Sequence, residues 1–448
     1  MNETGLAHRQ QHPAPAPTSS PGIRTDRATI VSWGLWDMGS AAFNAVLVTF
    51  VFSVYLTDSV GLNIHTSAPP STWYSLAIAL SGVAIAMVAP VMGQRADARG
   101  QRRRSVRVWT LATFALMMAL FFIRNDGPGY FWAGITIMAI ASVTFAMSEV
   151  SYYAMINQVS TRDNVGQVSG FGWSLGYFGG IILLLLCYVG FISGSAGGQA
   201  GLLGISTDGG LNIRLVAVIA ALWFLFLGLP VMFKVPEIPA NPAMETGGLK
   251  SSYKHLFATL KHLWVADRNT LWFLLASAVF RDGLAGVFTF GAILAVSVYG
   301  FAADQVLLFG VAANVISAIG ALACGRFDDK YGPKPVIAVS LACMVIVSAV
   351  LYVVSGTTMF WIFGLALCLF VGPAQSASRT FLSRLASGGN EGQLFGLYAT
   401  TGRAVSPLAP ALFSLFTGIT GQDRTGILAI GLILVAGLVM MIPVKQPR

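Results

Sequence analysis

The stretch from Gly93 to Arg102, GQRADARGQR, and the stretch from Gly325 to Lys334, GRFDDKYGPK, share the pattern G-x3-D-x2-G-x-[RK] at an offset of 232 residues. A second pair, GQVSGFGWSLG from Gly166 and GQLFGLYATTG from Gly392, shares G-Q-x2-G-x5-G at an offset of 226 residues. Two markers that recur at nearly the same offset indicate an internal duplication. We therefore expect two similar halves.

The composition indicates a membrane protein. Of the 448 residues, 55% are hydrophobic and only 10% are charged, and the mean hydropathy is +0.71. Soluble domains carry about 25% charged residues, so a soluble protein is excluded. The four cysteines lie in apolar runs without a CxxC spacing, which favours small core residues over a disulfide framework or a metal site.

Twelve apolar segments are long enough to span a bilayer, which takes roughly 20 residues. They form two sets of six, and in each set one marker follows the second span while the other begins the fifth. We predict an all-α membrane protein with two pseudo-symmetric six-helix bundles, 29–234 and 270–448, a cytoplasmic linker at 235–269 and a disordered cytoplasmic tail at 1–28. The predicted spans are 30–56, 72–93, 105–123, 130–156, 166–191, 211–233, 270–299, 304–325, 334–355, 358–383, 392–418 and 424–444.

Basic residues predict the orientation, because cytoplasmic loops are enriched in Lys and Arg. Of the 27 Lys and Arg residues, 21 lie at the termini or in loops on one side of the predicted spans, 3 lie on the other side and 3 lie within spans. We therefore expect both termini in the cytoplasm and the chain in the cell (inner) membrane. The net charge of +9 is explained by this asymmetry, so nucleic-acid binding is not expected.

Two parallel six-helix halves are the architecture of major facilitator transporters, and the G-x3-D-x2-G-x-[RK] loop resembles the signature of that superfamily. Within it, the chain resembles the vacuole-effluxer-like (autophagy-related) family, also called the unknown major facilitator family. The resemblance implies a major facilitator fold, and eukaryotic members are linked to amino-acid release from the vacuole. The chain departs from the family pattern after Asp37, where a Trp-Ala-Asn-like run is usual, and at Arg281, where Asn is usual. The matching stretches are WGLWDMGSAAFNAVLVTFVFSVYL from Trp33, VSGFGWSLGYFGG from Val168, LPVMFKVPE from Leu229, RDG from Arg281, GPAQSASRTFLSRL from Gly372 and FGLYATTGRAVSPLAP from Phe395.

Six ionisable residues lie within predicted spans, where each costs about 2.5–3.5 kcal/mol unless it faces water or a partner. In the implied fold the first, fourth, seventh and tenth spans line a central cavity, and five of the six charges fall on those spans. Asn44 and Gln375 are uncharged polar residues on the same spans and are candidate ligands. The six charges are Asp37, Glu149, Arg281, Asp282, Arg379 and Arg403.

Spacing suggests roles for these charges. Glu149 and Arg379 lie 230 residues apart, close to the repeat interval, so we expect a Glu149–Arg379 bridge that acts as a cytoplasmic gate. Arg281 and Asp282 point about 100° apart on a helix, so one is expected in the cavity and the other against a neighbouring helix. We expect Asp282 to carry a coupling proton and Arg281 or Arg403 to bind a substrate carboxylate. The alternative is that all six charges form structural bridges.

The two signature loops are expected to act as conformational switches. Asp97 and Asp329 are predicted to pair with arginines or helix ends in one conformation, and so to set the alternating-access equilibrium. The alternative is that the loops only anchor the topology. The loop residues concerned are Gly93, Asp97, Gly100, Arg102, Gly325, Asp329, Gly332 and Lys334.

These features predict a secondary transporter of small polar solutes, with amino acids and efflux favoured, coupled to a proton gradient and acting as a monomer in the bilayer. Charges of both signs suit a zwitterion. Two alternatives stay open: a multidrug or metabolite exporter with a mainly apolar pocket, and a membrane sensor that does not move its ligand. The sequence has no P-loop, no catalytic constellation and no histidine within a span, so we expect no enzyme, cofactor or metal site.

Overall fold

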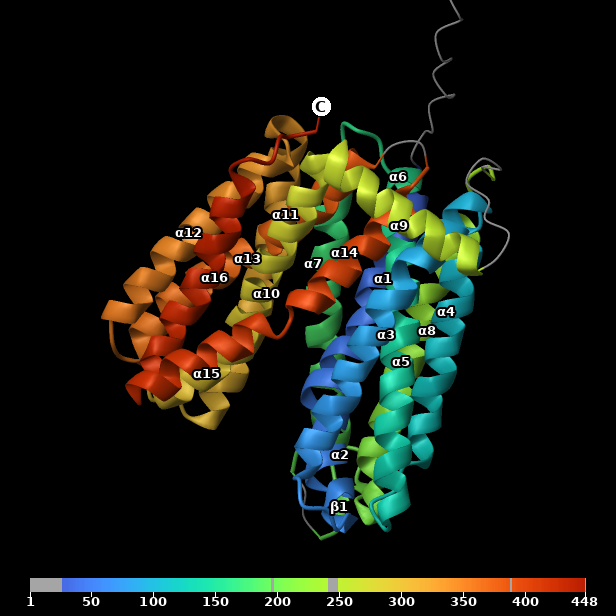
Figure 1. Cartoon of the computed structure of the whole chain (residues 1–448). Coiled ribbons are helices and arrows are strands. Elements are labelled where there is room, and N and C mark those ends of the chain that lie inside the picture. Colours follow the sequence, from blue (N-terminus) through green and yellow to red (C-terminus); the bar gives the residue numbers. More distant parts are fainter. Residues whose placement is uncertain (1–25, 195–196, 241–248, 387–388, 448) are drawn as a thin grey trace, which may run out of the picture.

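The computed structural model describes residues 26–194, 197–240, 249–386 and 389–447. Within these residues, eleven helical segments are long and apolar enough to span a membrane. They form two groups, one from each half of the chain, so the predicted fold class is confirmed (Figure 1). Residues 1–25 of the predicted tail lie outside the described residues, and α1 begins at Arg27.

The first group contains the helices up to Lys234. Stacked aromatic rings form part of its core: Trp36 of α1 and Tyr152 of α5 lie 4.2 Å apart between ring centroids. A two-residue hairpin, β1–β2, lies at the end away from the C-terminus (Figure 1). The elements are α1 (Arg27–Ala41), the π-helix η1 (Ala42–Phe50), α2 (Phe52–Asp58), η2 (Val60–Asn63), α3 (Pro70–Ala98), α4 (Arg102–Ala119), η3 (Leu120–Phe122), α5 (Pro128–Ala154), α6 (Ile156–Val159), α7 (Val165–Cys187), η4 (Tyr188–Ile192), β1 (Gln199–Ala200), β2 (Ile205–Ser206), η5 (Asp208–Gly210) and α8 (Leu211–Lys234).

The second group follows an additional helix, α9 (Leu249–Val265), which lies in the predicted linker and was not expected as a helix. Sequence signals set several helix ends: Pro333 occupies the first position of α12, and the Asp267 side chain accepts a hydrogen bond from the Thr270 amide at the start of α10. The elements are α10 (Arg268–Ser297), α11 (Ala303–Tyr331), α12 (Pro333–Val353), α13 (Thr357–Leu385), α14 (Glu391–Val405), α15 (Leu408–Thr420), η7 (Asp423–Thr425) and α16 (Gly426–Met441).

The predicted span 392–418 is not one helix, and this corrects the expected count of twelve continuous spans. It is divided into α14 and α15 at Ser406 and Pro407. Proline lacks a backbone N–H and its ring clashes with the preceding turn, which favours a break here. Since α3, α8 and α13 continue through an internal proline, the break also depends on its surroundings, where the Asp282 side chain accepts a hydrogen bond from the Ala409 amide at the start of α15. Beyond the break, α15 packs against α10 and α16 of its own half (Figure 1).

The two halves pack tightly at one end, which we call the closed end. Here α3 packs against α14, and α7 packs against α11 and α13. The glycines that begin the sequence markers lie where the two halves meet, at contacts that we call seams. A Cβ atom at Gly93 would overlap the carbonyl oxygen of Gly392, and a Cβ atom at Gly325 would lie 2.8 Å from the carbonyl oxygen of Gly166. Toward the other end the two groups of helices diverge in Figure 1.

Candidate functional site

Five of the six predicted intramembrane charges form one electrostatically coupled set between the halves, which we call the central charge cluster. Arg379 is ion-paired with Asp37, and Glu149 interacts with Arg403, Arg281 and Asp37. Two acids and three arginines leave an excess of one positive charge when all five are ionised. The cluster consists of Asp37 (α1), Glu149 (α5), Arg281 (α10), Arg379 (α13) and Arg403 (α14).

Arg379 reaches from the second half into the first. Its Nη1 atom lies 2.9 Å from Asp37 Oδ2, and its Nε and Nη2 atoms donate to the hydroxyl and carbonyl oxygens of Ser169 at 3.0 and 2.7 Å. The guanidinium also lies over the rings of Trp33 and Tyr153, at 4.8 and 5.1 Å from their centroids. Arg379 is only 1% exposed, so a buried, charge-assisted network joins the halves at this point.

A glycine of α7 makes room for this network. A Cβ atom at Gly172 would lie 2.5 Å from Asp37 Oδ2 and 2.9 Å from Arg379 Nη2. Gly172 begins the small-xxx-small pattern that continues at Gly176 and Gly180, and all three glycines face α1. The pattern therefore serves both close helix packing and the charge pair.

The predicted Glu149–Arg379 bridge is wrong in this conformation. Arg379 is paired with Asp37, whereas the Glu149 carboxylate accepts a hydrogen bond from the Tyr153 hydroxyl at 3.1 Å. The repeat offset predicts equivalent depths for the two residues, but the rotation of α5 and α13 about their axes determines the partner. Glu149 instead interacts most strongly with the positive charge of Arg403.

Arg281 and Asp282 point to different neighbours, as their adjacent positions on a helix predict. The Arg281 guanidinium carbon lies 3.3 Å from the ring centroid of Tyr398, and Nη2 donates to the Tyr398 carbonyl oxygen at 2.7 Å. Arg281 is half-buried and lies close enough to α14 that a Cβ atom at Gly402 would be 2.5 Å from Nη2. The cation is thus held at the face of α10 that meets α14.

Asp282 lies apart from the central charge cluster. It is buried, and its Oδ2 atom accepts a hydrogen bond from the backbone amide of Ala409 at 2.7 Å. Ala409 is the second residue of α15, so Asp282 caps the helix that begins after the break at Pro407. The negative charge also suits the positive end of that helix dipole.

We predict that Asp282→Ala will destabilise the broken helix and that Asp282→Asn will not. Asparagine retains an oxygen that can accept from the Ala409 amide, whereas loss of a capping side chain costs about 1 kcal/mol. Thermal unfolding of the purified protein in detergent should therefore show a lower Tm for Asp282→Ala than for wild type and Asp282→Asn. An equal decrease in both variants would show that the charge matters rather than the hydrogen bond.

Arg403 is the most accessible member of the cluster. It is exposed on α14, and its Cδ atom lies 3.9 Å from the position of a Cβ atom on Gly82 of α3, across the seam between the halves. Within the described part of the chain its guanidinium has no hydrogen-bond partner. Arg403 is therefore the cation of the cluster best able to receive an external anion.

The two uncharged candidates are placed less centrally. Gln375 lies on α13, one helical turn from Arg379, and is half-buried. Asn44 is exposed in the π-helical segment η1, and its side chain forms no hydrogen bond among the described residues. π-Helical turns frequently occur at functional sites, but the structure does not bring Asn44 into contact with the cluster.

The signature loop of the first half meets a helix start of the second half. Asp97 accepts a hydrogen bond from Arg102 Nε at 2.7 Å and another from the Gln393 backbone amide, at the start of α14, at 3.0 Å. Arg102 is 1% exposed and also forms an ion pair with Glu391. These residues close the α3–α14 seam.

Glu391 precedes the apolar part of α14, so it lies outside the membrane-spanning segments. Burial favours its neutral form, but the charge of Arg102 and the hydrogen bonds from Arg102 and Asn157 outweigh burial and hold the pKa of Glu391 below its ordinary value. The pair with Arg102 is thus ionised at neutral pH.

The second signature loop forms the mirror contact with the first half. Asp329 accepts hydrogen bonds from the backbone amides of Gly166 and Gln167, at 2.6 and 3.0 Å, at the start of α7. Its oxygen lies 3.5 Å from Arg384, whereas Lys334 donates to the carbonyl oxygens of Ile442 and Val444 in its own half. Both predicted contacts of a loop aspartate with a helix end are therefore present in this conformation.

The glycines within the loops permit tight turns. Gly100 has φ of +62° and Gly332 has φ of +89°, in the region that favours glycine. A Cβ atom at Gly100 would also overlap the carbonyl oxygen of Ile238. The loops can therefore lie close to the chain that follows α8 and to the end of α16.

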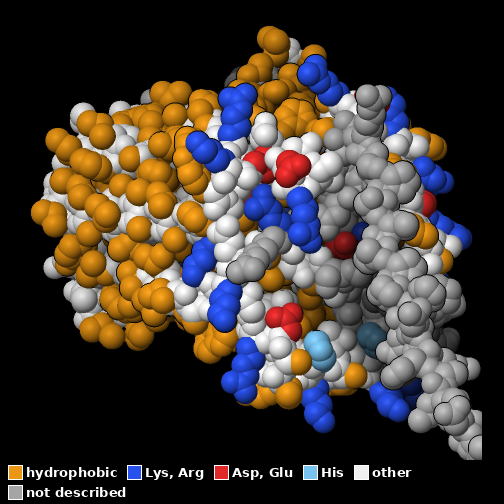
Figure 2. All heavy atoms as spheres, turned by 90° about the horizontal axis from the view of Figure 1, so that it is seen from above, with side chains coloured by type: hydrophobic (Ala, Val, Ile, Leu, Met, Phe, Trp, Pro, Cys, Tyr) orange, Lys and Arg blue, Asp and Glu red, His pale blue; other side chains and the backbone are white. Residues whose placement is uncertain are grey.

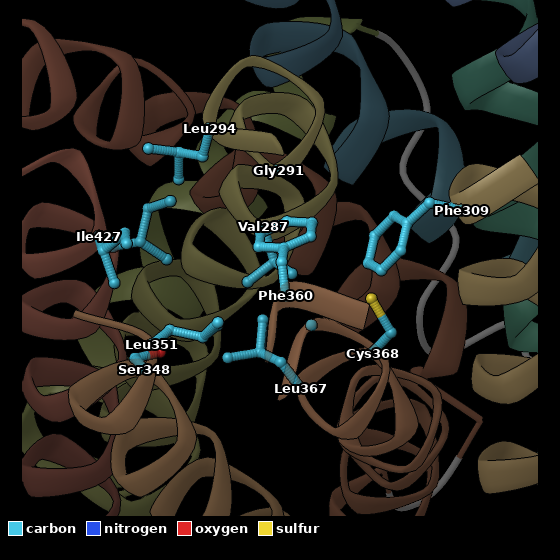
Figure 3. Close-up of a pocket in the computed structure, with 12 residues that line it drawn as sticks. Val287, Gly291, Leu294, Phe309, Ser348, Leu351, Phe360, Leu367, Cys368 and Ile427 are labelled. Carbon is cyan, nitrogen blue, oxygen red and sulfur yellow. The ribbon is translucent and has the colours of Figure 1, made fainter. Parts of the chain in front are cut away.

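An apolar pocket lies within the second half rather than between the halves (Figure 3). Its cavity volume is about 40 Å³, room for only a few water molecules, and no charged residue lines it. It therefore does not fit a polar solute. Among its lining residues are Val287 and Leu294 of α10, Phe309 of α11, Leu351 of α12 and Phe360 of α13.

Sequence reasoning missed several partners of the predicted residues. Ser169 contacts Arg379 through its hydroxyl and carbonyl oxygens, and Tyr398 contacts the half-buried Arg281 through its carbonyl oxygen and ring. Neither pairing is signalled by the sequence. Glu391 did leave a signal, because it immediately precedes the second Gly-Gln marker where the first half has Val165. This departure from the repeat marks the partner of Arg102.

Comparison with known proteins identifies related sequences. Residues 157–448 match the family described as vacuole effluxer Atg22-like. The chain is 24% identical over 414 residues to YxiO of Bacillus subtilis (strain 168), described as an uncharacterized MFS-type transporter, with 92% of this chain and 93% of that protein covered. It is 25% identical over 321 residues to autophagy-related protein 22-1 of Aspergillus fumigatus, with 65% of this chain and 49% of that protein covered. The chain thus spans about half the length of this fungal relative.

Solved structures resemble the fold. The proton:xylose symporter XylE superposes with a TM-score of 0.71 at 14% identity, covering 94% of this chain and 96% of that chain. FucP, a major facilitator transporter in the outward conformation, superposes with a TM-score of 0.69 at 14% identity, covering 94% and 100%. At this identity the likeness shows the fold alone.

Proposed function

Because the chain belongs to the vacuole effluxer Atg22-like family, whose relatives are major facilitator transporters and not enzymes, we propose that it moves small zwitterionic solutes by alternating access. The chain is a multi-pass integral membrane protein. Amino acids are the favoured class of solute. The observation that carries this proposal is the central charge cluster, where one acid, Glu149, lies under the influence of two arginines.

The cluster offers complementary groups for both ends of an amino acid. Arg403 is exposed and free of hydrogen bonds within the described residues, so it can bind a carboxylate. Glu149 can pair with an ammonium group, while Arg281 is already held by Tyr398. Asp37 and Arg379 neutralise each other and are buried, so they supply the bridge between the halves rather than a binding group.

Proton coupling follows from competition for Glu149. A carboxyl group in a membrane site can hold either a proton or the ammonium group of the solute, but not both. Binding of the solute would then release a proton, which produces exchange of solute against protons. Asp282, the acid favoured by the sequence, is occupied by the Ala409 amide in this conformation, so Glu149 is the better candidate.

The proposed orientation places the closed end in the cytoplasm. Viewed from the closed end, Lys and Arg side chains are spread over this face and few acidic ones are visible (Figure 2). Since basic loops face the cytoplasm, both termini would lie on the cytoplasmic side of the cell membrane. This conformation would then be open to the outside of the cell. Exchange against an inward proton gradient would then drive efflux. Every cluster residue comes from one chain, so a monomer suffices.

The test is proton movement in liposomes that contain a lumenal pH dye. Amino acids are added as a pool and then singly to wild type, Glu149→Gln and Asp282→Asn. Wild type and Asp282→Asn should show substrate-dependent proton movement. Glu149→Gln should lose it, yet still exchange labelled for unlabelled amino acid at higher solute concentrations. That exchange requires no proton transfer, and the Gln amide oxygen can still accept a hydrogen bond from the ammonium group, although without the charge.

Other outcomes assign the proton or the substrate elsewhere. Loss in Asp282→Asn alone would return the coupling role to Asp282, and equal movement in all three proteins would remove both acids from coupling. Absence of movement and exchange with every amino acid, in vesicles of verified orientation, would overturn the zwitterion proposal.

A second candidate is export of organic anions that lack an amino group. The excess of one positive charge in the central charge cluster favours it. One structural neighbour, described as the human organic anion transporter MFSD10, superposes with a TM-score of 0.67 at 13% identity. Simple carboxylates tested in the same liposomes distinguish the two candidates. The organic-anion candidate requires that a carboxylate without an amino group is transported.

A further inference from the structure

The helix α9 divides its surface into three stripes with different chemistry. Residues at helical spacing, Ser252, Leu256 and Leu263, are buried against the protein. Beside them lies an apolar stripe that includes Phe257, 68% exposed, and Trp264, 67% exposed. At 100° per residue, the next stripe carries Lys250, Lys254 and Lys261, all exposed. No acidic residue occurs in α9.

The position of α9 places these stripes at the edge of the membrane. In Figure 1 α9 crosses the closed end obliquely, above α3 and beside the start of α10. The Tyr253 hydroxyl donates to the carbonyl oxygen of Met87, which belongs to the apolar part of α3. The apolar stripe is therefore at the level where α3 leaves the hydrocarbon, and an aromatic stripe beside lysines is typical of a helix at the headgroup boundary.

The same helix contacts the seam that closes this end. The Thr259 hydroxyl accepts a hydrogen bond from Gln393 Nε2 at 3.2 Å. The backbone amide of Gln393 donates to Asp97, so α9 is one residue removed from the contact between the signature loop and α14. A ligand that fixes α9 would therefore favour the conformation in which this seam is formed.

We propose that α9 binds the headgroups of anionic phospholipids through Lys250, Lys254 and Lys261, and that this binding favours the conformation with the closed end shut. The occupant is a lipid rather than a protein. The exposed apolar stripe suits acyl chains and the adjacent lysines suit anionic headgroups, and these two parts of a lipid lie next to each other at the membrane surface. Each lysine near an anionic surface contributes on the order of fivefold to such binding. The inference does not depend on the identity of the transported solute.

The test combines lipid retention with a distance measurement. Lys250, Lys254 and Lys261 are changed together to Gln, and the control changes the exposed Arg99, Arg326 and Lys445 to Gln, with the same loss of charge. Native mass spectrometry measures retained phosphatidylglycerol relative to phosphatidylcholine. Spin labels at Arg104→Cys and Lys330→Cys, in a chain whose four native cysteines are Ser, report the separation of the halves.

Wild type and the control variant should retain phosphatidylglycerol preferentially, and the α9 variant should lose this preference by roughly tenfold or more. In vesicles of phosphatidylcholine with one quarter phosphatidylglycerol, wild type and control should shift toward the short distance relative to pure phosphatidylcholine, and the α9 variant should not. Equal retention in all three proteins would overturn the site. Loss of retention without any lipid-dependent shift in wild type would overturn the conformational part.

Discussion

Arg379→Gln should abolish solute transport and strongly destabilise the protein. Arg379 is the only cation bonded to Asp37 among the described residues, and Asp37 is 8% exposed, so the variant leaves a carboxylate buried without its partner. Removing one partner of a buried ion pair costs about 3–5 kcal/mol. Transport in liposomes and the Tm in detergent measure the two effects. Arg424→Gln is the matched control, at a half-buried arginine that donates to the Tyr352 carbonyl oxygen and the Ser355 hydroxyl near the opposite end of the second half. It should leave transport unchanged and lower the Tm less than Arg379→Gln, because no buried carboxylate loses its partner.

The double variant Asp37→Asn, Arg379→Gln separates stability from transport. Asn and Gln can share a neutral hydrogen bond, so the double variant should be more stable than the single Arg379→Gln variant. Coupling between contacting residues commonly reaches about 0.5–3 kcal/mol. Transport should stay absent, because the charge-assisted bridge between the halves, on which we expect the alternating-access cycle to depend, is missing. Strictly additive decreases in Tm, or transport retained by Arg379→Gln, would contradict a role for the pair.

Much of the fold could be predicted from the sequence because hydropathy and repetition are properties of long segments. The offsets between Gly93 and Gly325 and between Gly166 and Gly392 indicated the duplication, and the apolar runs located eleven spans. Packing of each signature loop against the other half's second marker did not follow from these offsets. The α14–α15 break also depends on a local balance, in which Pro407 stops one helix and Asp282 caps the next.

The candidate site was predicted in its residues but not in its pairing. Counting along the chain placed Glu149 and Arg379 at similar depths, yet a rotation of one helix by 100° changes the partner of a side chain. Only for the adjacent residues Arg281 and Asp282 did the sequence predict the relative directions of the side chains. The two side chains do contact different helices, α14 and α15. The helix α9 escaped prediction because its lysines resemble a solvated linker when only composition is considered.

The central charge cluster and the closed end are joined by short polar connections. Ser169, which binds Arg379, also donates its hydroxyl to the carbonyl oxygen of Ser376 across the α7–α13 contact. Asp329 accepts hydrogen bonds from the amides of Gly166 and Gln167 at the start of α7, within one turn of Ser169 in the same helix. A change of charge at Arg379 is therefore expected to affect α7, the same helix whose start binds Asp329 of the second signature loop.

Gly93→Leu should hold the closed end open and abolish transport. Even the first side-chain carbon at position 93 would overlap the carbonyl oxygen of Gly392, and the backbone of α14 cannot move aside without leaving the seam. Overpacking costs about 1–3 kcal/mol, which corresponds to roughly a five- to 150-fold decrease in the equilibrium constant for closing this end. Spin labels at Arg104→Cys and Lys330→Cys should report longer distances than in wild type. Gly392→Leu should act alike, because a Cβ there would lie 2.6 Å from the Gly93 carbonyl oxygen.

The matched control for this substitution is Gly310→Leu. Gly310 also lies inside a membrane helix, α11, but a Cβ atom there meets nothing within 4 Å among the described residues. The control should therefore keep the wild-type distances and transport, which separates the effect of the seam from the effect of adding a leucine to a helix. Wild-type distances in Gly93→Leu would show that α14 yields to the larger side chain. Longer distances with normal transport would show that closure of this seam is not a required step of the cycle.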